Sequence, residues 1–361
     1  MLFLEPYYGG SHRAFADGLR EHSQHRVELH TLPARFWKWR MRGAALHFAV
    51  QVSHPERFDV LMVSSLLSLA DLRALWGTRC PPAVVYFHEN QLSYPVPEGT
   101  RPDVHFGFTD ITTALAAERL LFNSEFHRSA FLKVLPSFLR QMPDYVPRWV
   151  PELLADRGRV LHPGCELPPP APSEAGSEGD AALPPLIVWN HRWEFDKRPE
   201  AFFAAVRTVS DSGVPLRVAL LGENFQVVPR AFEEARAWLG DRIVRYGYVP
   251  DREQYWRLLR AGRVAVSTAS QENFGMATVE AIWAGNHPLL PRRLAYPEVV
   301  PERFHAACLY DDDDELAERL AATLLSPAAA PSGLADAMQH YSWRVQAPAY
   351  DRVLEEVAAG G

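Results

Sequence analysis

Short apolar runs alternate with helix-like stretches along almost the whole chain, and no other feature of the sequence constrains the fold as much. Within these runs apolar and polar residues do not alternate, which is typical of parallel strands buried on both faces. We expect strands at residues 2–4, 27–32, 60–64, 84–87, 120–122, 186–189, 217–221, 243–246, 264–266 and 287–290. Helical patterns occupy residues 15–20, 199–209, 230–239, 252–259 and 276–284. The sequence therefore predicts doubly wound α/β domains, whose ligands bind at the carboxyl ends of strands.

A stretch at residues 167–185 interrupts this pattern. It is rich in Pro, Ser, Gly, Ala and acidic residues, which bury too little apolar area to order a chain, so we interpret it as a surface linker. We predict a Rossmann-like domain at residues 1–166, a second one at 186–340 and a packed C-terminal helix at 341–361. Two domains suit a chain of 361 residues, since one domain usually takes about 100–200.

Charge is distributed unevenly between the two halves of the chain. The sequence holds 37 Lys and Arg against 44 Asp and Glu, a formal charge of −7, which excludes a protein held to nucleic acid by overall positive charge. Residues 1–150 hold 16 basic against 14 acidic residues, or +2, whereas residues 151–361 hold 21 against 30, or −9. We therefore expect any polyanionic partner to prefer the first domain.

The three cysteines, Cys80, Cys165 and Cys308, lie far apart in the sequence. Zinc sites, iron–sulfur centres and disulfide scaffolds need closely spaced or paired cysteines, so we expect none of them. So few cysteines suit a reducing compartment, and no apolar run approaches the roughly 18 residues of a membrane span. We expect a cytoplasmic protein.

Two motifs of the first domain follow expected strands. Residues 7–12 read Tyr-Tyr-Gly-Gly-Ser-His. Gly9 and Gly10 permit unusual backbone angles, and Ser11 would cap a helix whose free N–H groups suit a phosphate or a sugar. A turn without a ligand explains this motif equally well. His88 follows a later strand and could exchange a proton with a reacting oxygen, although a half-buried histidine without a catalytic role is the alternative.

The second domain offers a pair of cations where its first strand ends. Arg192 and Lys197 precede an expected helix, and a guanidinium with an ammonium suits a diphosphate. A surface salt-bridge cluster with Glu194 and Asp196 is the alternative.

Glu272 and Glu280 are separated by seven residues, and a helix is expected to begin near Gly275. The start of a helix leaves backbone N–H groups without a partner. Eight residues of helix rise about 12 Å, whereas the paired carboxyl groups of glycosidases stand about 5–9.5 Å apart. The spacing therefore favours two separate contacts with hydroxyl groups over a glycosidase pair. A helix with an acidic start is the alternative.

Aromatic and basic residues are concentrated at residues 35–42, which read Arg-Phe-Trp-Lys-Trp-Arg-Met-Arg. Single-stranded RNA loops are bound by stacking on aromatic side chains and by cations at phosphates. A packed aromatic stretch with solvated cations is the alternative.

These motifs together resemble a known family. Residues 272–280 are similar to the E-x7-E signature of retaining GT4-type GT-B glycosyltransferases, and Arg192 with Lys197 resembles their diphosphate pair. Segments that resemble the hinge and the nucleotide pocket of these enzymes lie at residues 161–166, 222–223 and 246–249. In the first domain, segments at residues 5–12, 31–40 and 87–95 resemble the tRNA-queuosine mannosyltransferase family.

This resemblance implies a GT-B fold, in which two Rossmann-like domains face each other and the active site lies in the cleft between them. It also implies transfer of mannose from GDP-mannose, with net retention, to queuosine in the anticodon loop of tRNA-Asp. Two other functions stay open: a GT4-like glycosyltransferase acting on a small molecule, lipid or glycan, and a non-catalytic protein that binds a sugar nucleotide or RNA.

The resemblance further implies a role for each candidate residue. The catalytic roles fall to His88, Arg192, Lys197 and Glu272. Donor binding falls to Gly10, Ser11, Asn190, Gly222, Gly247, Tyr248, Phe274, Gly275, Met276 and Glu280. Contacts with tRNA fall to His12, Arg35, Trp37, Lys38, Trp39, Arg40, Arg42 and Asn90.

No metal or other cofactor is implied, because cations and helix ends would neutralise the diphosphate. The acidic run at residues 311–314 could be mistaken for a set of metal ligands. Because it precedes a helical pattern, we interpret it as acidic capping of a helix N-terminus.

Overall fold

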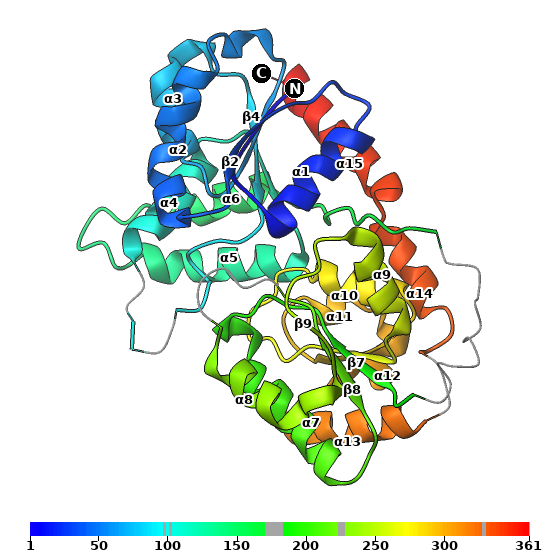
Figure 1. Cartoon of the computed structure of the whole chain (residues 1–361). Helices are drawn as coiled ribbons and strands as arrows, with labels where there is room; N and C mark the ends of the chain where they lie inside the picture. Colours follow the sequence, from blue (N-terminus) through cyan, green and yellow to red (C-terminus); the bar gives the residue numbers. More distant parts are fainter. Residues whose placement is uncertain (97–98, 101–102, 170–182, 223–227, 327–329, 361) are drawn as a thin grey trace. The chain divides into compact units, whose positions relative to one another are not determined.

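The computed structural model describes residues 1–96, 99–100, 103–169, 183–222, 228–326 and 330–360. The chain forms two compact units, the first made of Met1–Glu166 with Tyr341–Gly361 and the second of Leu167–His340. Most of the expected linker, residues 170–182, lies outside the described residues. Each unit contains a six-stranded sheet with helices packed against it (Figure 1).

The sheet of the first unit has the strand order β2-β1-β3-β4-β5-β6, and every neighbouring pair is parallel. The strands are β1 (Leu2–Tyr8), β2 (Glu28–Pro33), β3 (Leu61–Ser64), β4 (Ala83–Phe87), β5 (Arg119–Phe122) and β6 (Gly158–Val160). The central strands β3 and β4 are buried at every residue, as expected for short apolar runs with helices on both sides.

Helices cover both faces of this sheet, because successive residues of a strand point to opposite sides. One face packs against α2 (Trp37–Gln51), α3 (Leu69–Trp76), α4 (Val104–Leu115), α5 (Glu125–Leu139) and α6 (Val150–Arg157). The other face packs against α1 (Gly10–His22) and the C-terminal helix α15 (Trp343–Ala359) (Figure 1). The last helix of the chain is therefore part of the first unit.

The sheet of the second unit has the strand order β12-β11-β10-β7-β8-β9, again with parallel pairs. The strands are β7 (Leu186–Trp189), β8 (Arg217–Leu220), β9 (Ile243–Tyr246), β10 (Val264–Val266), β11 (His287–Pro291) and β12 (Leu309–Tyr310). The predicted class, α/β with parallel sheets, is thus confirmed in both units.

Two layers of helices also enclose the second sheet. One face packs against α7 (Pro199–Asp211), α8 (Arg230–Leu239) and α13 (Asp313–Leu325), and the other against α9 (Arg252–Ala261) and α10 (Met276–Trp283). Three short helices complete the unit: α11 (Tyr296–Val299), α12 (His305–Cys308) and α14 (Leu334–Ala337). Among the described residues, no helix combines the length and the hydropathy that a membrane crossing requires.

The expected strands are all present, but two short edge strands, β6 and β12, were not expected. The prediction that Ser11 caps the first helix is wrong, because α1 begins at Gly10 and its N-cap is Gly9. A Cβ on Gly9 would lie 2.4 Å from the Cβ of Ala34, so only glycine fits at this position. The acidic cap at residues 311–314 is confirmed, since the Asp312 side chain accepts a hydrogen bond from the Glu315 N–H at 2.9 Å.

Candidate functional site

The topology of each sheet marks one edge as the place for a ligand. In the first unit β1 lies between β2 and β3. The strand order therefore runs from β1 to β2 on one side, and from β3 onward on the other side. In the second unit β7 lies between β8 and β10 in the same way. Ligands of open parallel sheets bind at such switch points, beyond the carboxyl ends of the strands. The polar residues that follow these strands are therefore the candidates within each unit.

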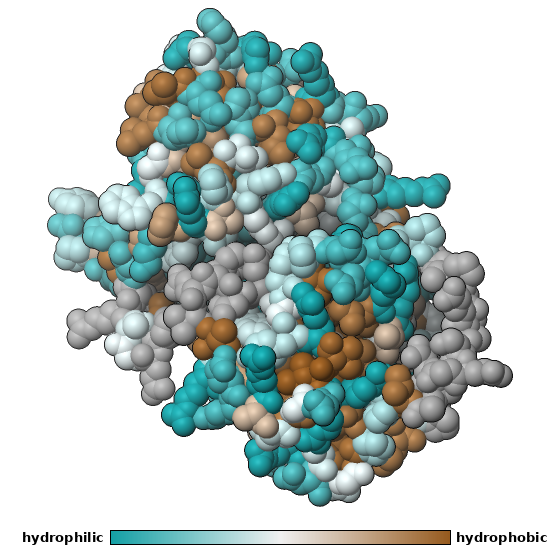
Figure 2. Space-filling view, viewed as in Figure 1, coloured by the Kyte–Doolittle hydropathy of each residue, from teal (hydrophilic) through white to brown (hydrophobic). Residues whose placement is uncertain are grey.

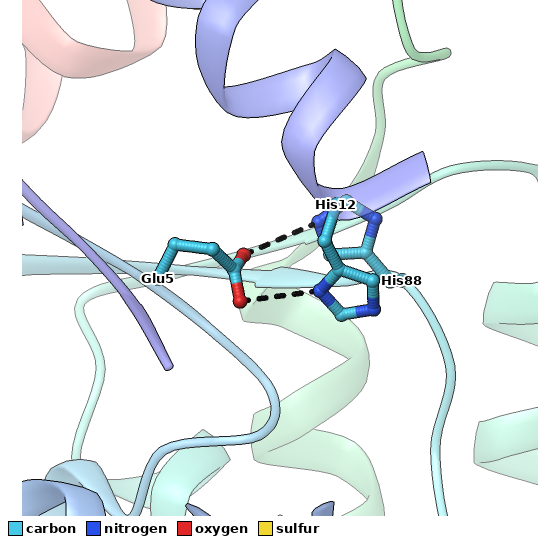
Figure 3. Close-up of side chains that lie close together, drawn as sticks. All are labelled: Glu5, His12 and His88. Carbon is cyan, nitrogen blue, oxygen red and sulfur yellow. Dashed lines mark hydrogen bonds and ion pairs between the residues drawn. The ribbon is translucent and has the colours of Figure 1, made fainter. Parts of the chain in front are cut away.

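A buried group of polar side chains occupies the switch point of the first unit (Figure 3). Glu5, on β1, is fully buried, and its Oε1 accepts hydrogen bonds from the Tyr7 N–H at 2.8 Å and the Ser64 hydroxyl at 3.0 Å. His12, in the first turn of α1, places Nδ1 3.2 Å from the same oxygen. His88, after β4, places Nε2 3.8 Å from Glu5 Oε2. The two imidazole rings stack with centroids 3.9 Å apart, and each directs one nitrogen at the Glu5 carboxylate.

Glu89 completes this group, although the sequence analysis did not single it out. Its Oε2 lies 3.4 Å from His12 Nε2, so both nitrogens of His12 face a carboxylate. The Glu89 side chain is 25% exposed, whereas the Glu5 side chain is fully buried. The only signal in the sequence was its place directly after His88, at the end of a buried strand. We call Glu5, His12, His88 and Glu89 the histidine–carboxylate cluster.

The two histidines of this cluster have different charge states. Burial alone would lower the pKa of His12, but the carboxylates of Glu5 and Glu89 raise it to about 10. Burial lowers the pKa of His88 well below its ordinary value, and the charge on His12 lowers it further. At neutral pH His12 is therefore an imidazolium that donates from both nitrogens, and His88 is a neutral imidazole.

The histidine–carboxylate cluster fits a metal ion poorly. Glu5, His12 and His88 each offer a ligand atom, and these atoms lie within 4.8 Å of one another. However, a histidine ligand must present a nitrogen lone pair, and the imidazolium of His12 has none. The two stacked rings also direct their nitrogens side by side at Glu5 rather than toward a common point (Figure 3). The arrangement suits a fixed pattern of charges better than a metal centre.

The predicted phosphate loop lies at the start of α1. Gly10, with a φ of +51°, is the first residue of the helix, and Ser11 follows it in the first turn. The N–H groups of a first turn have no partner within the helix and suit an anion or a sugar hydroxyl. The role of Gly10 and Ser11 in donor binding stays a prediction.

A buried lysine occupies the switch point of the second unit. Lys197 ends a short 3-10 helix (Phe195–Lys197) after β7, and its Nζ donates to the Gln271 carbonyl oxygen at 2.6 Å. The same Nζ lies 3.3 Å from Glu272 Oε2 and 3.3 Å from Asp196 Oδ2. Burial alone would raise the pKa of the Glu272 carboxyl, but the charge of Lys197 holds it below its ordinary value. The fold therefore brings two predicted catalytic residues, Lys197 and Glu272, together.

Arg192 belongs to the same edge but is far more exposed than Lys197. Its Nη1 lies 3.3 Å from Glu194 Oε1, at the surface. Both ion pairs of the alternative interpretation, Arg192 with Glu194 and Lys197 with Asp196, are thus present. They differ in burial, because the Lys197 and Asp196 side chains are almost inaccessible. An exposed guanidinium can exchange a surface carboxylate for a phosphate at little cost.

Glu280 is buried in α10 and held by two residues of α9 that the sequence analysis missed. Its Oε1 accepts a hydrogen bond from Arg252 at 2.6 Å, and its Oε2 accepts one from the Tyr255 hydroxyl at 2.7 Å. Asn190 donates to the Tyr255 hydroxyl at 3.2 Å and to the Ala277 carbonyl oxygen at 2.8 Å. Burial and the neighbouring Glu280 raise the pKa of Tyr255 well above its ordinary value, so this hydroxyl keeps its proton. The predicted donor residues Asn190 and Glu280 are thereby joined in one network.

Three more predicted donor-binding residues follow β8 and β9. Gly222 lies so close to the preceding loop that a Cβ would stand 1.8 Å from the His191 carbonyl oxygen. Gly247 has a φ of +103° and donates its N–H to the Leu220 carbonyl oxygen at 2.8 Å. Tyr248, next to it, is exposed. Glu223, in the segment that resembles the nucleotide pocket, lies outside the described residues.

The start of α10 brings the remaining donor-binding candidates to the carboxyl end of β10. Gly275 is the N-cap of this helix and has a φ of +95°, which a residue with a Cβ rarely adopts. Met276 begins the helix, and Phe274 is buried just before it. Glu272 lies three residues before Gly275, so a carboxylate and the helix N-terminus are neighbours. This arrangement can present both acceptors and donors to a hydroxylated ligand.

The structure divides the aromatic–basic segment at residues 35–42 into a packed part and an exposed part. Trp37 packs against Phe106 with ring centroids 5.2 Å apart, and the cations of Lys38 and Arg42 lie 5.9 Å and 5.5 Å from the Phe106 ring. Arg40 folds back and donates to the Pro33 carbonyl oxygen at 3.1 Å.

Phe36 and Trp39 are instead 69% and 75% exposed, and Arg35 is exposed beside them. The hydrophobic surface continues along α2 and α3, where Leu46, Val50 and Leu75 are exposed (Figure 2). The packing interpretation thus holds for Trp37. Phe36 and Trp39 expose rings on which a base could stack, and RNA binding by this segment stays a prediction.

A second exposed aromatic pair lies in the connection between α5 and α6. Tyr145 is 92% exposed with a φ of +46°, and Trp149 is 58% exposed. Arg140 and Arg148 are exposed in the same connection. The sequence analysis passed over this stretch because its aromatic and basic residues are spread over ten positions.

Two predicted tRNA contacts are buried. Asn90 is 1% exposed, and its Oδ1 accepts hydrogen bonds from the N–H groups of Leu92 and Ser93 at 3.0 Å and 2.8 Å. Its amide therefore stabilises a turn. His12 is held between Glu5 and Glu89 as described above. Direct contact of either residue with RNA stays a prediction.

Two different family models match the two parts of the chain. A family model described as "tRNA-queuosine alpha-mannosyltransferase N-terminal" matches residues 1–165. A model described as "Glycosyl transferases group 1" matches residues 177–341. The tRNA-queuosine alpha-mannosyltransferase of Drosophila melanogaster is 36% identical over 328 residues, which are 89% of this chain and 85% of that protein.

Solved structures support the fold over its full length. Sucrose-phosphate synthase from Thermosynechococcus elongatus is 16% identical with a TM-score of 0.76, and the match covers 100% of this chain and 99% of that chain. An alpha,alpha-trehalose-phosphate synthase from Burkholderia vietnamiensis is 12% identical with a TM-score of 0.71, with 100% and 99% covered. These similarities, with the two parallel sheets, confirm the GT-B fold.

Proposed function

Because the chain belongs to the tRNA-queuosine alpha-mannosyltransferase family, we propose that this glycosyltransferase moves mannose from GDP-mannose to the queuosine of tRNA-Asp. The observation that carries the proposal is the 36% identity to the Drosophila melanogaster enzyme across 89% of this chain. Transfer from an α-linked donor to an α-linked product means that the configuration at the sugar carbon is retained.

The second unit would hold the donor. Lys197 and Arg192 would bind the diphosphate and stabilise the negative charge that grows on it as the sugar leaves. Cations fixed where charge develops make a large catalytic contribution. Glu272, held in place by Lys197 at 3.3 Å, would accept hydrogen bonds from hydroxyls of the sugar. Glu280, whose two oxygens are already oriented by Arg252 and Tyr255, would do the same for the ribose.

The chemistry needs no separate protein base. In front-face attack the acceptor hydroxyl approaches on the side from which the diphosphate leaves, and a donor phosphate oxygen takes its proton. His88, neutral at physiological pH, would contact a sugar hydroxyl. We propose that the diphosphate is neutralised by Arg192, Lys197 and the helix N-termini, without a metal ion.

The first unit would recognise the tRNA. Phe36 and Trp39 expose rings on which unpaired bases can stack, and exposed cations beside them suit the phosphates. Tyr145 and Trp149 offer a second surface of the same kind. This unit also lacks the acidic excess of the rest of the chain, since residues 1–166 and 341–361 hold 20 basic and 20 acidic residues, whereas residues 167–340 hold 17 and 24.

The decisive experiment measures transfer of radiolabelled mannose from GDP-mannose to queuosine-containing tRNA-Asp, with the same tRNA carrying guanosine as the control. The expected result is label on the modified tRNA alone. Without transfer, but with GDP-mannose binding by calorimetry, the acceptor would be another molecule. Without transfer or binding, the donor would be wrong. A Glu272→Ala variant that kept full cellular function would indicate a non-catalytic binding protein.

A further inference from the structure

Glu89 is the one member of the histidine–carboxylate cluster with access to solvent. Its side chain is 25% exposed, whereas those of Glu5, His12 and His88 are at most 7% exposed. It follows β4, two strands from β1 in the sheet, so it lies at the carboxyl edge where ligands of such sheets bind. A ligand that approaches this edge would therefore meet the Glu89 carboxylate before the rest of the cluster.

The cluster holds Glu89 firmly in one place. His12 Nε2 donates to Glu89 Oε2 across 3.4 Å, while His12 Nδ1 is fixed by Glu5 Oε1 at 3.2 Å. Glu5 is fixed in turn by the Tyr7 N–H and the Ser64 hydroxyl. The Glu89 backbone is also held, because its carbonyl oxygen accepts a hydrogen bond from the Ser65 hydroxyl at 2.9 Å. Glu89 is thus held at one carboxylate oxygen and at its backbone carbonyl, and this pre-organisation reduces the freedom that it loses when a ligand binds.

The charges of the cluster select the kind of ligand. The carboxylates of Glu5 and Glu89 outnumber the one imidazolium of His12, so the cluster carries one net negative charge. A phosphate would be repelled there. A metal ion would have to displace the proton of His12 before that nitrogen could bind it. A carboxylate favours an ammonium group or paired hydroxyls, which donate hydrogen bonds to its two oxygens.

We propose that Glu89 recognises the side chain that distinguishes queuosine from guanosine, by binding its secondary ammonium group and neighbouring hydroxyls. This inference rests on the proposed function and deepens it, since it names the group that selects the modified nucleoside. Queuosine carries an aminomethyl link to a cyclopentene ring with two vicinal hydroxyls, and guanosine has neither the cation nor the diol. Glu5 and His12 are positioning residues that act through Glu89.

The test compares the affinity of Glu89→Gln for two tRNAs of the same sequence, one with queuosine and one with guanosine. The variant keeps the shape and removes the charge. A hydrogen bond to a charged group is worth about tenfold to a hundredfold in affinity. We expect the variant to lose this factor for the queuosine tRNA and to bind the guanosine tRNA as the wild type does. Glu89→Asp, which keeps the charge, should restore part of the preference.

Glu56→Gln is the matched control, because it removes an exposed carboxylate of the same unit outside the cluster. GDP-mannose affinity, measured by calorimetry, reports whether each variant is folded. Equal losses of affinity for both tRNAs would overturn the inference, and so would an unchanged preference. If the wild type transfers mannose to the queuosine tRNA but Glu89→Gln keeps its preference, only this inference fails. If the wild type binds the two tRNAs equally but still transfers mannose to the queuosine tRNA, again only this inference fails; if the wild type transfers no mannose to that tRNA, the proposed function fails with it.

Discussion

At the scale of single residues, the buried ammonium group of Lys197 organises the carboxylates at the candidate site of the second unit. Lys197 lies 3.3 Å from both Glu272 and Asp196, so two carboxylates share its charge before any ligand arrives. The sequence predicted Lys197 and Glu272 because family motifs mark them. It also offered Asp196 as a salt-bridge partner, but at the surface, and it could not predict that this pair is buried, since that depends on how the loop after β7 turns back.

Glu272→Gln tests the role of this carboxylate in catalysis. The amide keeps the size of the side chain but accepts hydrogen bonds from sugar hydroxyls less strongly than a carboxylate does. We expect kcat/KM for mannose transfer to fall about tenfold to a hundredfold. Thermal unfolding should change little, because Lys197 still donates to the Gln271 carbonyl oxygen. An unchanged kcat/KM would remove Glu272 from the reaction.

The pKa of His12 makes the stability of the first unit depend on pH. Its value in the folded chain is about 10, above the ordinary 6.5, so the protonated form is stabilised by folding. The contribution is fully present below about pH 6.5 and is lost as the pH rises toward 10. We expect the difference in unfolding free energy between the wild type and His12→Gln to be largest near pH 6 and to shrink with rising pH. Urea unfolding at several pH values measures it, and a difference independent of pH would contradict the ion-pair geometry.

At the scale of elements, α2 shows how one sequence motif can serve two purposes. The segment at residues 35–42 is a single aromatic–basic run, and its sequence does not show which side chains are packed and which are exposed. In the helix these side chains point in different directions, because residues two apart lie on different faces. Trp37 turns toward Phe106, and Trp39 turns toward solvent. The short edge strands β6 and β12 escaped prediction for a related reason, since two or three residues carry too little periodicity.

Trp39→Ala and Trp37→Ala form a matched pair that tests this division. Stacking of one base on an aromatic ring is worth about 1–3 kcal/mol. We expect Trp39→Ala to weaken tRNA binding by a corresponding factor, about fivefold or more, with unfolding unchanged. Trp37→Ala should instead lower the unfolding free energy by about 2 kcal/mol, because it removes a packed ring. Binding titrations and urea unfolding of both variants check this. If Trp37→Ala weakened tRNA binding and Trp39→Ala lowered stability, the RNA contact would lie on the opposite face of α2.

At the scale of the whole molecule, tRNA must bind a chain whose overall charge opposes it. The formal charge is −7, and the negative excess lies entirely in residues 151–361, which carry −9. The aromatic side chains that we propose to stack on tRNA, Phe36, Trp39, Tyr145 and Trp149, all belong to the first unit. The composition could not predict which cations are available to bind phosphates. Arg40 and Lys38, for example, already have partners within the unit.

Paired charge reversals test where the tRNA binds. Lys38→Glu with Arg42→Glu changes the first unit, and Arg207→Glu with Arg230→Glu makes the same formal change in the second. We expect the first pair to weaken tRNA binding at least tenfold at low salt. The slope of log K against log salt should also become shallower, by about one for each phosphate that the variant no longer neutralises. The second pair should leave the slope unchanged. Equal effects of the two pairs would show that only net charge matters.

The return of α15 to the first unit has a consequence for how the protein is made. Trp343 fills the space over Gly18 and Gly164, where any added Cβ would collide with its ring, and Asp351 accepts hydrogen bonds from Ser23 and Gln24. The hydrogen bonds of Asp351 join residues that lie 328 and 327 positions apart in the chain. On the ribosome the second unit, an uninterrupted stretch, can complete its core while the first still exposes the apolar face of α1 and β4. The part of the chain that is translated first therefore matures last. A premature stop before the codons for α15 would leave this unit open for chaperones and proteases.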